Sequence, residues 1–171
     1  MKIKMITASI VFILLVPFIF GGCSRAANDE GFAIYLTKNN VPVQEMQALS
    51  HVDIANKPLI SGDDIIAYYW DTHDIQLTAE AFKRVDALQI PTTGVAFVVC
   101  VDKQPVYWGA FWAGYSSQSF DGITIMMKPS LAGDNRIAIT PGYPSSSFYQ
   151  GNDPRSYQVI KDSLKAAGKL N

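Results

Sequence analysis

The sequence is most informative between residues 77 and 112, where it is LTAEAFKRVDALQIPTTGVAFVVCVDKQPVYWGAFW. Thr78 is placed to cap a helix, because its hydroxyl can accept an N–H group of the first turn. Glu80 adds negative charge near the positive end of the helix dipole. Pro91 and Gly94 end the segment. The apolar residues recur at a helical spacing, so we expect an amphipathic helix whose buried face carries Ala79, Phe82, Val85 and Leu88.

Residues 95–101 follow this helix and are all apolar. A run of that length between helix-breaking residues is typical of a central strand that is buried on both faces. Asp102 and Lys103 begin a turn, and residues 105–112 return as a partner strand. Pro105 stands at the first position of that strand, where a missing N–H group is tolerated. The stretch therefore predicts a helix followed by a β-hairpin.

Several residues of the stretch occur in a characteristic order: Leu77, Thr78, Glu80, Ala81, Phe82, Gly94, Val101, Asp102 and Pro105. This order resembles the head part of the large periplasmic region of SecD and SecDF, membrane subunits that assist protein export. The resemblance implies a similar local fold, and contact with a polypeptide rather than catalysis. It does not extend to the multiple membrane spans of those proteins.

The N-terminal residues predict export from the cytoplasm. Lys2 and Lys4 precede an apolar run at residues 10–20, which has the length of a signal-peptide core and is short for a membrane span. The run ends in FGGC, residues 20–23, which resembles the lipobox of bacterial lipoproteins. That resemblance implies cleavage before Cys23 and attachment of lipid to its thiol. We therefore predict a lipoprotein signal peptide at 1–22, a tether at 23–31 and a single extracytoplasmic domain at 32–171.

Two other outcomes of export remain open. Residues 24–26 would also suit an ordinary signal peptidase, which would release a soluble secreted protein. An uncleaved apolar segment would instead remain as a membrane anchor. In all three cases the domain faces the extracytoplasmic side of the bacterial cell envelope, and in the preferred case it is attached to the membrane through lipid.

Composition agrees with one exported domain and excludes a nucleic-acid partner. The 171 residues are 49% hydrophobic and carry a formal net charge of −1, with no basic cluster of the kind that binds nucleic acid. Cys23 and Cys100 are the only cysteines. If Cys23 carries lipid, Cys100 has no disulfide partner, and its place in the apolar run predicts a small buried hydrophobic residue.

The rest of the chain predicts further strands and a second helix. Asp153 and Pro154 are expected to open that helix and Gly168 to end it. Its buried face would carry Tyr157, Ile160, Leu164 and Ala167. Further strands are expected at residues 32–36, 65–70, 75–78, 123–127 and 136–140. The predicted fold class is α+β, an antiparallel or mixed sheet with two main helices packed on one side.

No set of residues in the sequence specifies a reaction. His51 and His73 are the only histidines, so a histidine-dependent site must use one of them. Residues 71–74, DTHD, are more typical of a polar turn than of a metal site, which needs ligands from two elements. The chain has no Gly-rich phosphate loop and no nucleophile-elbow motif. We therefore expect no catalytic residues, no metal and no cofactor.

Aromatic residues are concentrated on the two hairpins that flank the first helix, and all three tryptophans are among them. Because neighbouring residues of a strand face opposite sides, they cannot all point into one core. An open side would present an aromatic platform for an extended peptide or a glycan. The alternative is that other segments cover these rings as part of the core. We predict binding residues at Trp70, Tyr107, Trp108 and Tyr115.

These observations favour a lipid-anchored, non-catalytic binding protein of the cell envelope. Its partners would be the membrane, through the lipid on Cys23, and an envelope protein, peptide or glycan. An accessory subunit without a ligand of its own remains open. The alternative is a small exported hydrolase that uses His73, with Asp71 or Asp74, and a serine of the loop at 116–119, which carries Ser116, Ser117 and Ser119.

Overall fold

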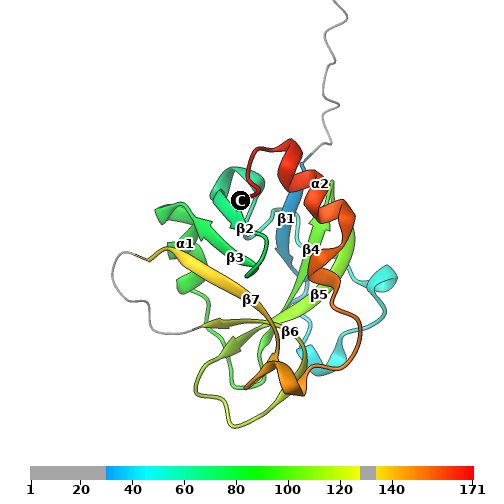
Figure 1. Cartoon of the computed structure of the whole chain (residues 1–171). Helices are drawn as coiled ribbons and strands as arrows, with labels where there is room; N and C mark the ends of the chain where they lie inside the picture. Colours follow the sequence, from blue (N-terminus) through cyan, green and yellow to red (C-terminus); the bar gives the residue numbers. More distant parts are fainter. Residues whose placement is uncertain (1–29, 128–133) are drawn as a thin grey trace, which may run out of the picture.

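Residues 30–127 and 134–171 are described by a computed structural model of the chain (Figure 1). In these residues seven strands form one sheet: β1 Phe32–Leu36, β2 Ile65–Tyr69, β3 Asp74–Leu77, β4 Val95–Val101, β5 Gln104–Ala113, β6 Phe120–Met127 and β7 Arg136–Tyr143. The two α-helices are α1 Ala79–Asp86 and α2 Gln158–Ala166. Single 3-10 turns lie between them: η1 Val43–Glu45, η2 Leu49–His51, η3 Gly62–Asp64, η4 Ser146–Phe148 and η5 Pro154–Ser156.

The strand order is β1-β4-β5-β6-β7-β3-β2, with β5 and β6 parallel and every other neighbouring pair antiparallel. The predicted strands are therefore confirmed, and several are longer than expected. The mixed sheet and the two helices are also confirmed. In the described part of the chain neither helix is long and apolar enough to cross a membrane.

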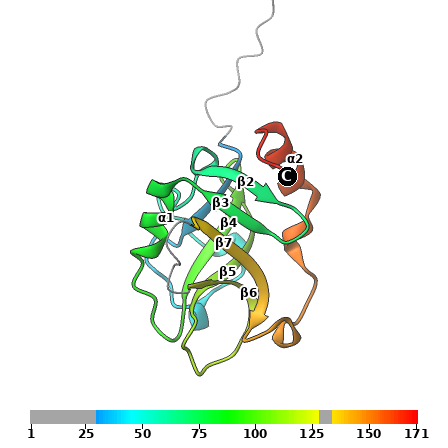
Figure 2. The ribbon, with the colours of Figure 1, turned by 60° about the vertical axis from the view of Figure 1, so that its left-hand side comes forward.

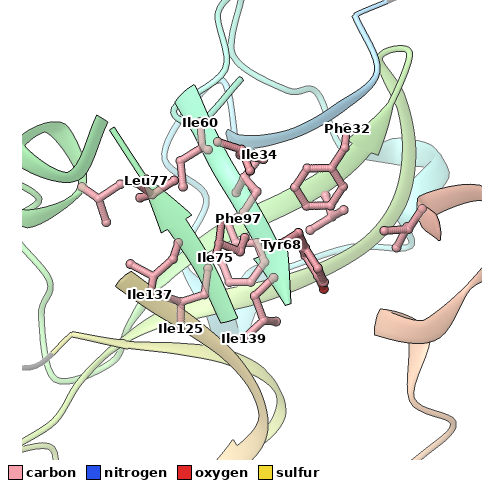
Figure 3. Close-up of a cluster of buried hydrophobic side chains, with 14 of the residues drawn as sticks. Phe32, Ile34, Ile60, Tyr68, Ile75, Leu77, Phe97, Ile125, Ile137 and Ile139 are labelled. Atoms are coloured by element: carbon pink, nitrogen blue, oxygen red, sulfur yellow. The ribbon is translucent and has the colours of Figure 1, made fainter. Parts of the chain in front are cut away.

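The sheet curls until its two end strands reach the same core. The rings of Phe32 on β1 and Tyr68 on β2 lie 5.8 Å apart, although these strands stand at opposite ends of the strand order. Figure 3 shows their side chains pointing toward those of the other strands, such as Ile75 and Ile139. We call this cluster the main core, and it also receives Val85 and Leu164 from the helices, among other residues.

Both edges of the sheet are covered by other parts of the chain. On the outer edge of β1, the Ile34 N–H donates to the carbonyl of Ile60 at 2.8 Å. On the outer edge of β2, the Tyr68 N–H donates to the carbonyl of Lys169 at 2.7 Å, and the Asn171 N–H donates to the carbonyl of Tyr68 at 2.8 Å. These bonds satisfy strand groups that would otherwise be open to pairing with another chain.

Strand β4 is buried on both faces, as its apolar run predicts. Phe97 and Val99 face the main core, whereas Val98 and Cys100 face the outside of the sheet. Partly buried side chains between η1 and the residues after η2 cover that outer side: Met46, Leu49, Val52 and Ile54. Cys100 has no disulfide, and burial raises the pKa of its thiol to about 12.

The first helix is capped as predicted, since the hydroxyl of Thr78 accepts the N–H of Ala81 at 3.2 Å. One residue of its buried face differs from the prediction. Val85 is buried, with Phe82 and Leu88 partly buried, but Ala81 takes the place predicted for Ala79, which is exposed. The reason is that an α-helix has about 3.6 residues per turn, so residues spaced by exactly three rotate away from the buried face. Ala79, three residues before Phe82 and six before Val85, therefore lies off that face.

The start of the second helix was predicted wrongly. Asp153 and Pro154 open the 3-10 turn η5, and α2 begins at Gln158 after the extended residue Tyr157. The Asp153 carboxylate accepts the backbone N–H of Arg155 and pairs with its guanidinium, so it caps a single turn. Gly168 ends α2 with a φ of +67°, as expected. Ile160 and Leu164 are buried, whereas Tyr157 and Ala167 are exposed.

The two helices do not clearly share one side of the sheet. α1 contacts β3, whereas α2 contacts β1 and β4, and the two helices lie well apart in both views (Figures 1 and 2). Because the sheet has seven strands and curls, one pair of short helices cannot cover a whole face. Their apolar residues instead complete the main core from two separate places.

The turn between β4 and β5 holds two non-glycine residues in the left-handed region, Asp102 at a φ of 51° and Lys103 at a φ of 64°. A two-residue hairpin turn of this kind matches the twist of the strands but favours glycine. We predict that Lys103→Gly raises the free energy of unfolding by about 0.5–1 kcal/mol, because glycine adopts this backbone without a steric penalty. Urea denaturation measures the change.

Lys103→Ala is the matched control for this substitution. It removes the same charge, including the exposed contact of Lys103 with Glu30 at 3.9 Å, but keeps a Cβ atom in the left-handed region. We expect no gain in stability for this variant. Equal stability of the Gly and Ala variants would contradict the proposed backbone effect.

Candidate functional site

The four aromatic residues predicted to bind a ligand lie in different surroundings. Tyr107 is buried in the main core, with 6% of its surface exposed. Trp108 lies on the opposite side of β5, where it is partly buried and its ring is 6.0 Å from that of Phe120. Trp70 is partly buried against the main core, and Tyr115 is 79% exposed. The four residues therefore do not form one continuous aromatic face.

The outer aromatic residues of β5 belong to a packed cluster. Trp112 is 1% exposed, and its ring stacks on Phe120 at 5.1 Å with 11° between the ring planes. Tyr143 packs on the same tryptophan at 6.0 Å, and its hydroxyl donates to the carbonyl of Gly114 at 3.1 Å. The rings of Tyr107 and Trp112 are therefore packed inside the protein. This is the alternative that the sequence left open for the aromatic residues.

His73 lies in a buried polar cluster at the tip of the β2–β3 hairpin. It is 6% exposed and has a φ of 57°. Its Nδ1 atom lies 2.9 Å from the hydroxyl of Tyr68, and its Nε2 atom lies 3.4 Å from Oγ of Ser156. The ring of Trp70 packs edge-on against the imidazole at 5.6 Å. The cluster thus ties the hairpin to the segment that precedes α2.

The serine beside His73 is not one that the sequence indicated. Oγ of Ser116 instead donates to the carbonyl of Thr92 at 2.7 Å and accepts the N–H of Gln118 at 3.1 Å, so it organises its own loop. Ser156 stands 83 residues after His73. Sequence reasoning missed it, because no local pattern links η5 with a distant hairpin.

The nearby carboxylates do not orient the imidazole through any hydrogen bond in the described residues. Asp74 accepts the hydroxyl of Thr72 at 3.0 Å, which supports the interpretation of residues 71–74 as a polar turn. Asp153 is paired with Arg155 at 2.5 Å, and hydrogen bonding from that arginine lowers the pKa of the Asp153 carboxyl. The described residues contain no group of three or more His, Cys, Asp or Glu side chains arranged to hold a metal ion.

Burial and charge both favour the neutral form of His73. Burial lowers the pKa of its imidazole, and the guanidinium of Arg155 lowers it further, against the opposing effect of Asp153, Asp71 and Asp74. A neutral imidazole accepts a hydrogen bond at one nitrogen and donates one from the other, which suits one donor and one acceptor among its two hydroxyl neighbours. His73 therefore holds the hairpin best when it is uncharged.

α2 and the start of β1 lie together at one end of the molecule (Figures 1 and 2). A separate cleft is lined by residues of both segments. Its volume is about 540 Å³. Its floor contains the buried side chains of Phe32, Ile65, Val101 and Leu164. Val159 of α2 also lines it and is 47% exposed. The carboxylates that line the cleft are Glu30, Asp63, Asp102 and Asp162. We call it the acid-rimmed cleft.

Two of these carboxylates are fixed by hydrogen bonds. Oδ1 of Asp102 accepts the N–H of Gly31 at 2.8 Å, and the Asp102 N–H donates to the carbonyl of Gly31 at 3.0 Å. Oε2 of Glu30 accepts the hydroxyl of Tyr35 at 2.5 Å. Burial, and then this hydrogen bond, raise the pKa of Tyr35, so the phenol keeps its proton and remains a donor. The chain entering β1 is thereby held against the β4–β5 turn.

The other two carboxylates are exposed. Asp63 lies in η3, where the neighbouring Asp64 makes the structural contacts by pairing with Arg84 at 2.6 Å. Asp162 lies on α2 and accepts the side-chain amide of Gln158 at 2.8 Å. In the described residues neither Asp63 nor Asp162 forms an ion pair with a lysine or arginine. Among the residues that the structure describes, Lys169 is the one basic residue in the lining of the cleft.

A second cleft, of about 530 Å³, lies between the end of β1 and the loop after α1. Its lining includes Leu36, Val41, Leu88 and Pro91, and none of the described residues that line it is charged. It therefore offers apolar contact without a group that would orient a ligand.

A scan of the chain against protein-family models found no match, and searches of curated proteins and of solved structures found none either.

The surroundings of His73 predict a specific pH dependence of stability. Because its pKa is lower in the folded than in the unfolded state, the unfolded chain binds the extra proton first. The free energy of unfolding should therefore fall as the pH drops below about 6.5. His73→Asn should flatten this slope between pH 7.5 and 5, since asparagine tolerates the left-handed backbone and does not titrate. Denaturation at each pH measures the slope.

His51→Asn provides the control, because His51 is the other histidine and is exposed. It should leave the slope unchanged. Protonation of Asp64 and Asp153 would change the free energy of unfolding near and below the ordinary pKa of aspartate, about 3.9. The range from pH 7.5 to 5 stays above that value. A slope that persists unchanged in His73→Asn would contradict this account of the imidazole.

Proposed function

We propose that this chain is an anchored binding protein of the bacterial cell envelope that engages a polypeptide through the acid-rimmed cleft. The anchor would be lipid on Cys23, after removal of the signal peptide at 1–22. Cys23 and most of the tether lie outside the described residues, so the anchor rests on the lipobox resemblance. The observation that carries the binding role is a concave site with an apolar floor and charged groups at its rim.

The character of the cleft favours a polypeptide over a glycan. Glycan sites commonly present open aromatic faces on which sugar rings stack, whereas the described lining of this cleft holds one aromatic residue, Phe32. Its other floor residues are aliphatic, such as Ile65 and Leu164, and suit the side chains of a peptide. Tyr107, proposed from the sequence as part of an aromatic platform, is buried. Trp70, Trp108 and Tyr115, the other residues proposed from the sequence, do not line the cleft, so we prefer the cleft as the contact surface.

A crosslinking experiment in intact cells tests this proposal. A photo-crosslinking amino acid at Asp63, on the rim, should capture a specific envelope protein. The same amino acid at Tyr115, the most exposed aromatic residue, should not capture that protein. Mass spectrometry of the same sample should show an N-terminal peptide that begins at Cys23 and carries lipid.

Cys23→Ser is the control for the anchor and should release the protein from the membrane fraction. Capture of a partner at Tyr115 but not at Asp63 would move the binding surface to the aromatic residues. An unmodified Cys23 thiol in the mature chain would contradict the anchored form of the proposal.

A hydrolase remains the second candidate, because Ser156 lies 3.4 Å from Nε2 of a neutral His73. A serine hydroxyl beside a neutral imidazole is the arrangement that activates a nucleophile. Here, however, a phenol rather than a carboxylate contacts the other ring nitrogen, so an imidazolium formed during catalysis would lack its usual stabilising partner. The geometry therefore supports the structural role of this pair better.

A fluorophosphonate probe separates the two functions. If His73 and Ser156 have only a structural role, the purified protein should show no covalent labelling. Ser156→Ala should likewise remain unlabelled and folded, since Ser156 is exposed. Labelling that disappears in both Ser156→Ala and His73→Asn would overturn the binding proposal in favour of the hydrolase.

A further inference from the structure

The charge balance of the acid-rimmed cleft points to the chemistry of its ligand. Among the described residues, four carboxylates and one ammonium group line it, and one of the carboxylates, Glu30, also contacts Lys103 at 3.9 Å. A hollow lined by one sign of charge above apolar walls concentrates the opposite charge from solution. The preferred ligand is therefore cationic.

A simple divalent cation does not fit this site. The carboxylates are spread around the rim, on the segment before β1, on η3, on the β4–β5 turn and on α2, and they do not converge as a metal-binding group in the described residues. Separate carboxylates above an apolar floor suit separate cationic side chains with aliphatic stems. Lysine and arginine combine these two properties, because their stems bury while their charged ends stay at the rim.

The interior of the cleft favours a ligand that has both an apolar side chain and a polar group. Val159 is half-exposed above a floor that includes Phe32 and Ile65, so an apolar ligand side chain would gain burial there. Ser163 also lines the cleft, and its buried hydroxyl has no hydrogen-bond partner in the described residues. A peptide backbone would satisfy that hydroxyl. The volume of about 540 Å³ accommodates a short segment rather than a folded surface.

The position of the cleft in the chain indicates where the ligand lies in the cell. Glu30 lines the cleft and stands seven residues after Cys23. If Cys23 carries lipid, as in the proposed function on which this inference rests, the fully extended linker spans at most about 25 Å. The rim would be repelled by anionic lipid headgroups, so the membrane surface itself is not the ligand.

We propose that the acid-rimmed cleft binds a short, membrane-proximal segment of a partner protein that carries lysine or arginine beside apolar side chains. The cationic groups pair with Asp63 and Asp162 at the rim, and an apolar side chain packs between Val159 and the floor. Such exposed pairs are screened by salt, so binding weakens as the ionic strength rises.

Binding of labelled peptides to the purified, lipidated full chain in neutral detergent tests this inference. The probe is a nine-residue peptide of alternating lysine and leucine, and a glutamate–leucine peptide and a lysine–serine peptide are its controls. The lysine–leucine peptide should bind most tightly. Asp63→Asn with Asp162→Asn should weaken it roughly three- to tenfold, as expected for two exposed ion pairs. Val159→Ser should also weaken it, without loss of folding because Val159 is half-exposed.

The matched control is Asp86→Asn with Asp121→Asn, which removes the same charge from exposed residues that do not line the cleft. It should leave binding unchanged. Equal binding of the glutamate–leucine peptide, or undiminished binding to the Asp63/Asp162 variant, would overturn the inference. Tighter binding of a cationic glucosamine oligomer would overturn the choice of a polypeptide.

The proposed function and the cationic ligand can be contradicted separately. If photo-crosslinking at Asp63 captures an envelope protein while the Asp63/Asp162 variant still binds the lysine–leucine peptide normally, the cationic ligand is wrong and the proposed function stands. If no partner is captured and Cys23 carries no lipid, the proposed function fails, and the membrane-proximal part of this inference fails with it.

Discussion

Burial of β4 on both faces is the constraint on which the rest of the structure depends. An all-apolar strand cannot lie at the surface of a flat sheet, so one side must meet the main core and the other must be covered separately. The chain meets both needs. The sheet curls around Phe97 and Val99, and the segment carrying η1 and η2 covers Val98 and Cys100.

This arrangement also determines where a ligand can bind. The large aromatic residues of β5 are used in packing, Tyr107 inside the curled sheet and Trp112 outside it. The open, charged surface lies instead at one end of the sheet, where the entry to β1, η3, the β4–β5 turn and α2 meet. There the apolar floor is continuous with the main core through Phe32, Ile65 and Leu164, so the acid-rimmed cleft has a rigid base.

Local features of the fold could be predicted from the sequence because each depends on neighbouring residues. The Thr78 cap, the apolar strand at 95–101 and the glycine at the end of α2 are of this kind. The start of α2 could not, since η5 is held by distant segments: Arg155 donates to the carbonyl of Ile139 at 2.7 Å, and Ser156 contacts His73. The parallel pairing of β5 with β6 and the curl of the sheet likewise depend on contacts between distant segments.

The candidate site could not be predicted from the sequence either, because it also depends on contacts between distant segments. The aromatic residues were conspicuous, but which side of a strand becomes covered is decided by segments elsewhere in the chain. The carboxylates Glu30, Asp63, Asp102 and Asp162 come from four separate places, and each resembles an ordinary surface residue when it is considered alone. Only the folded chain brings them around one apolar floor.

The central claim is that the acid-rimmed cleft, rather than the aromatic residues, is the contact surface of the anchored protein. Hydrogen–deuterium exchange of the lipidated chain in native membranes, compared with the purified chain, tests it most directly. We expect slower exchange in native membranes at η3 and along α2, with no change in the loop that carries Tyr115. Slower exchange confined to that loop and to the neighbourhood of Trp108, with η3 and α2 unchanged, would contradict it.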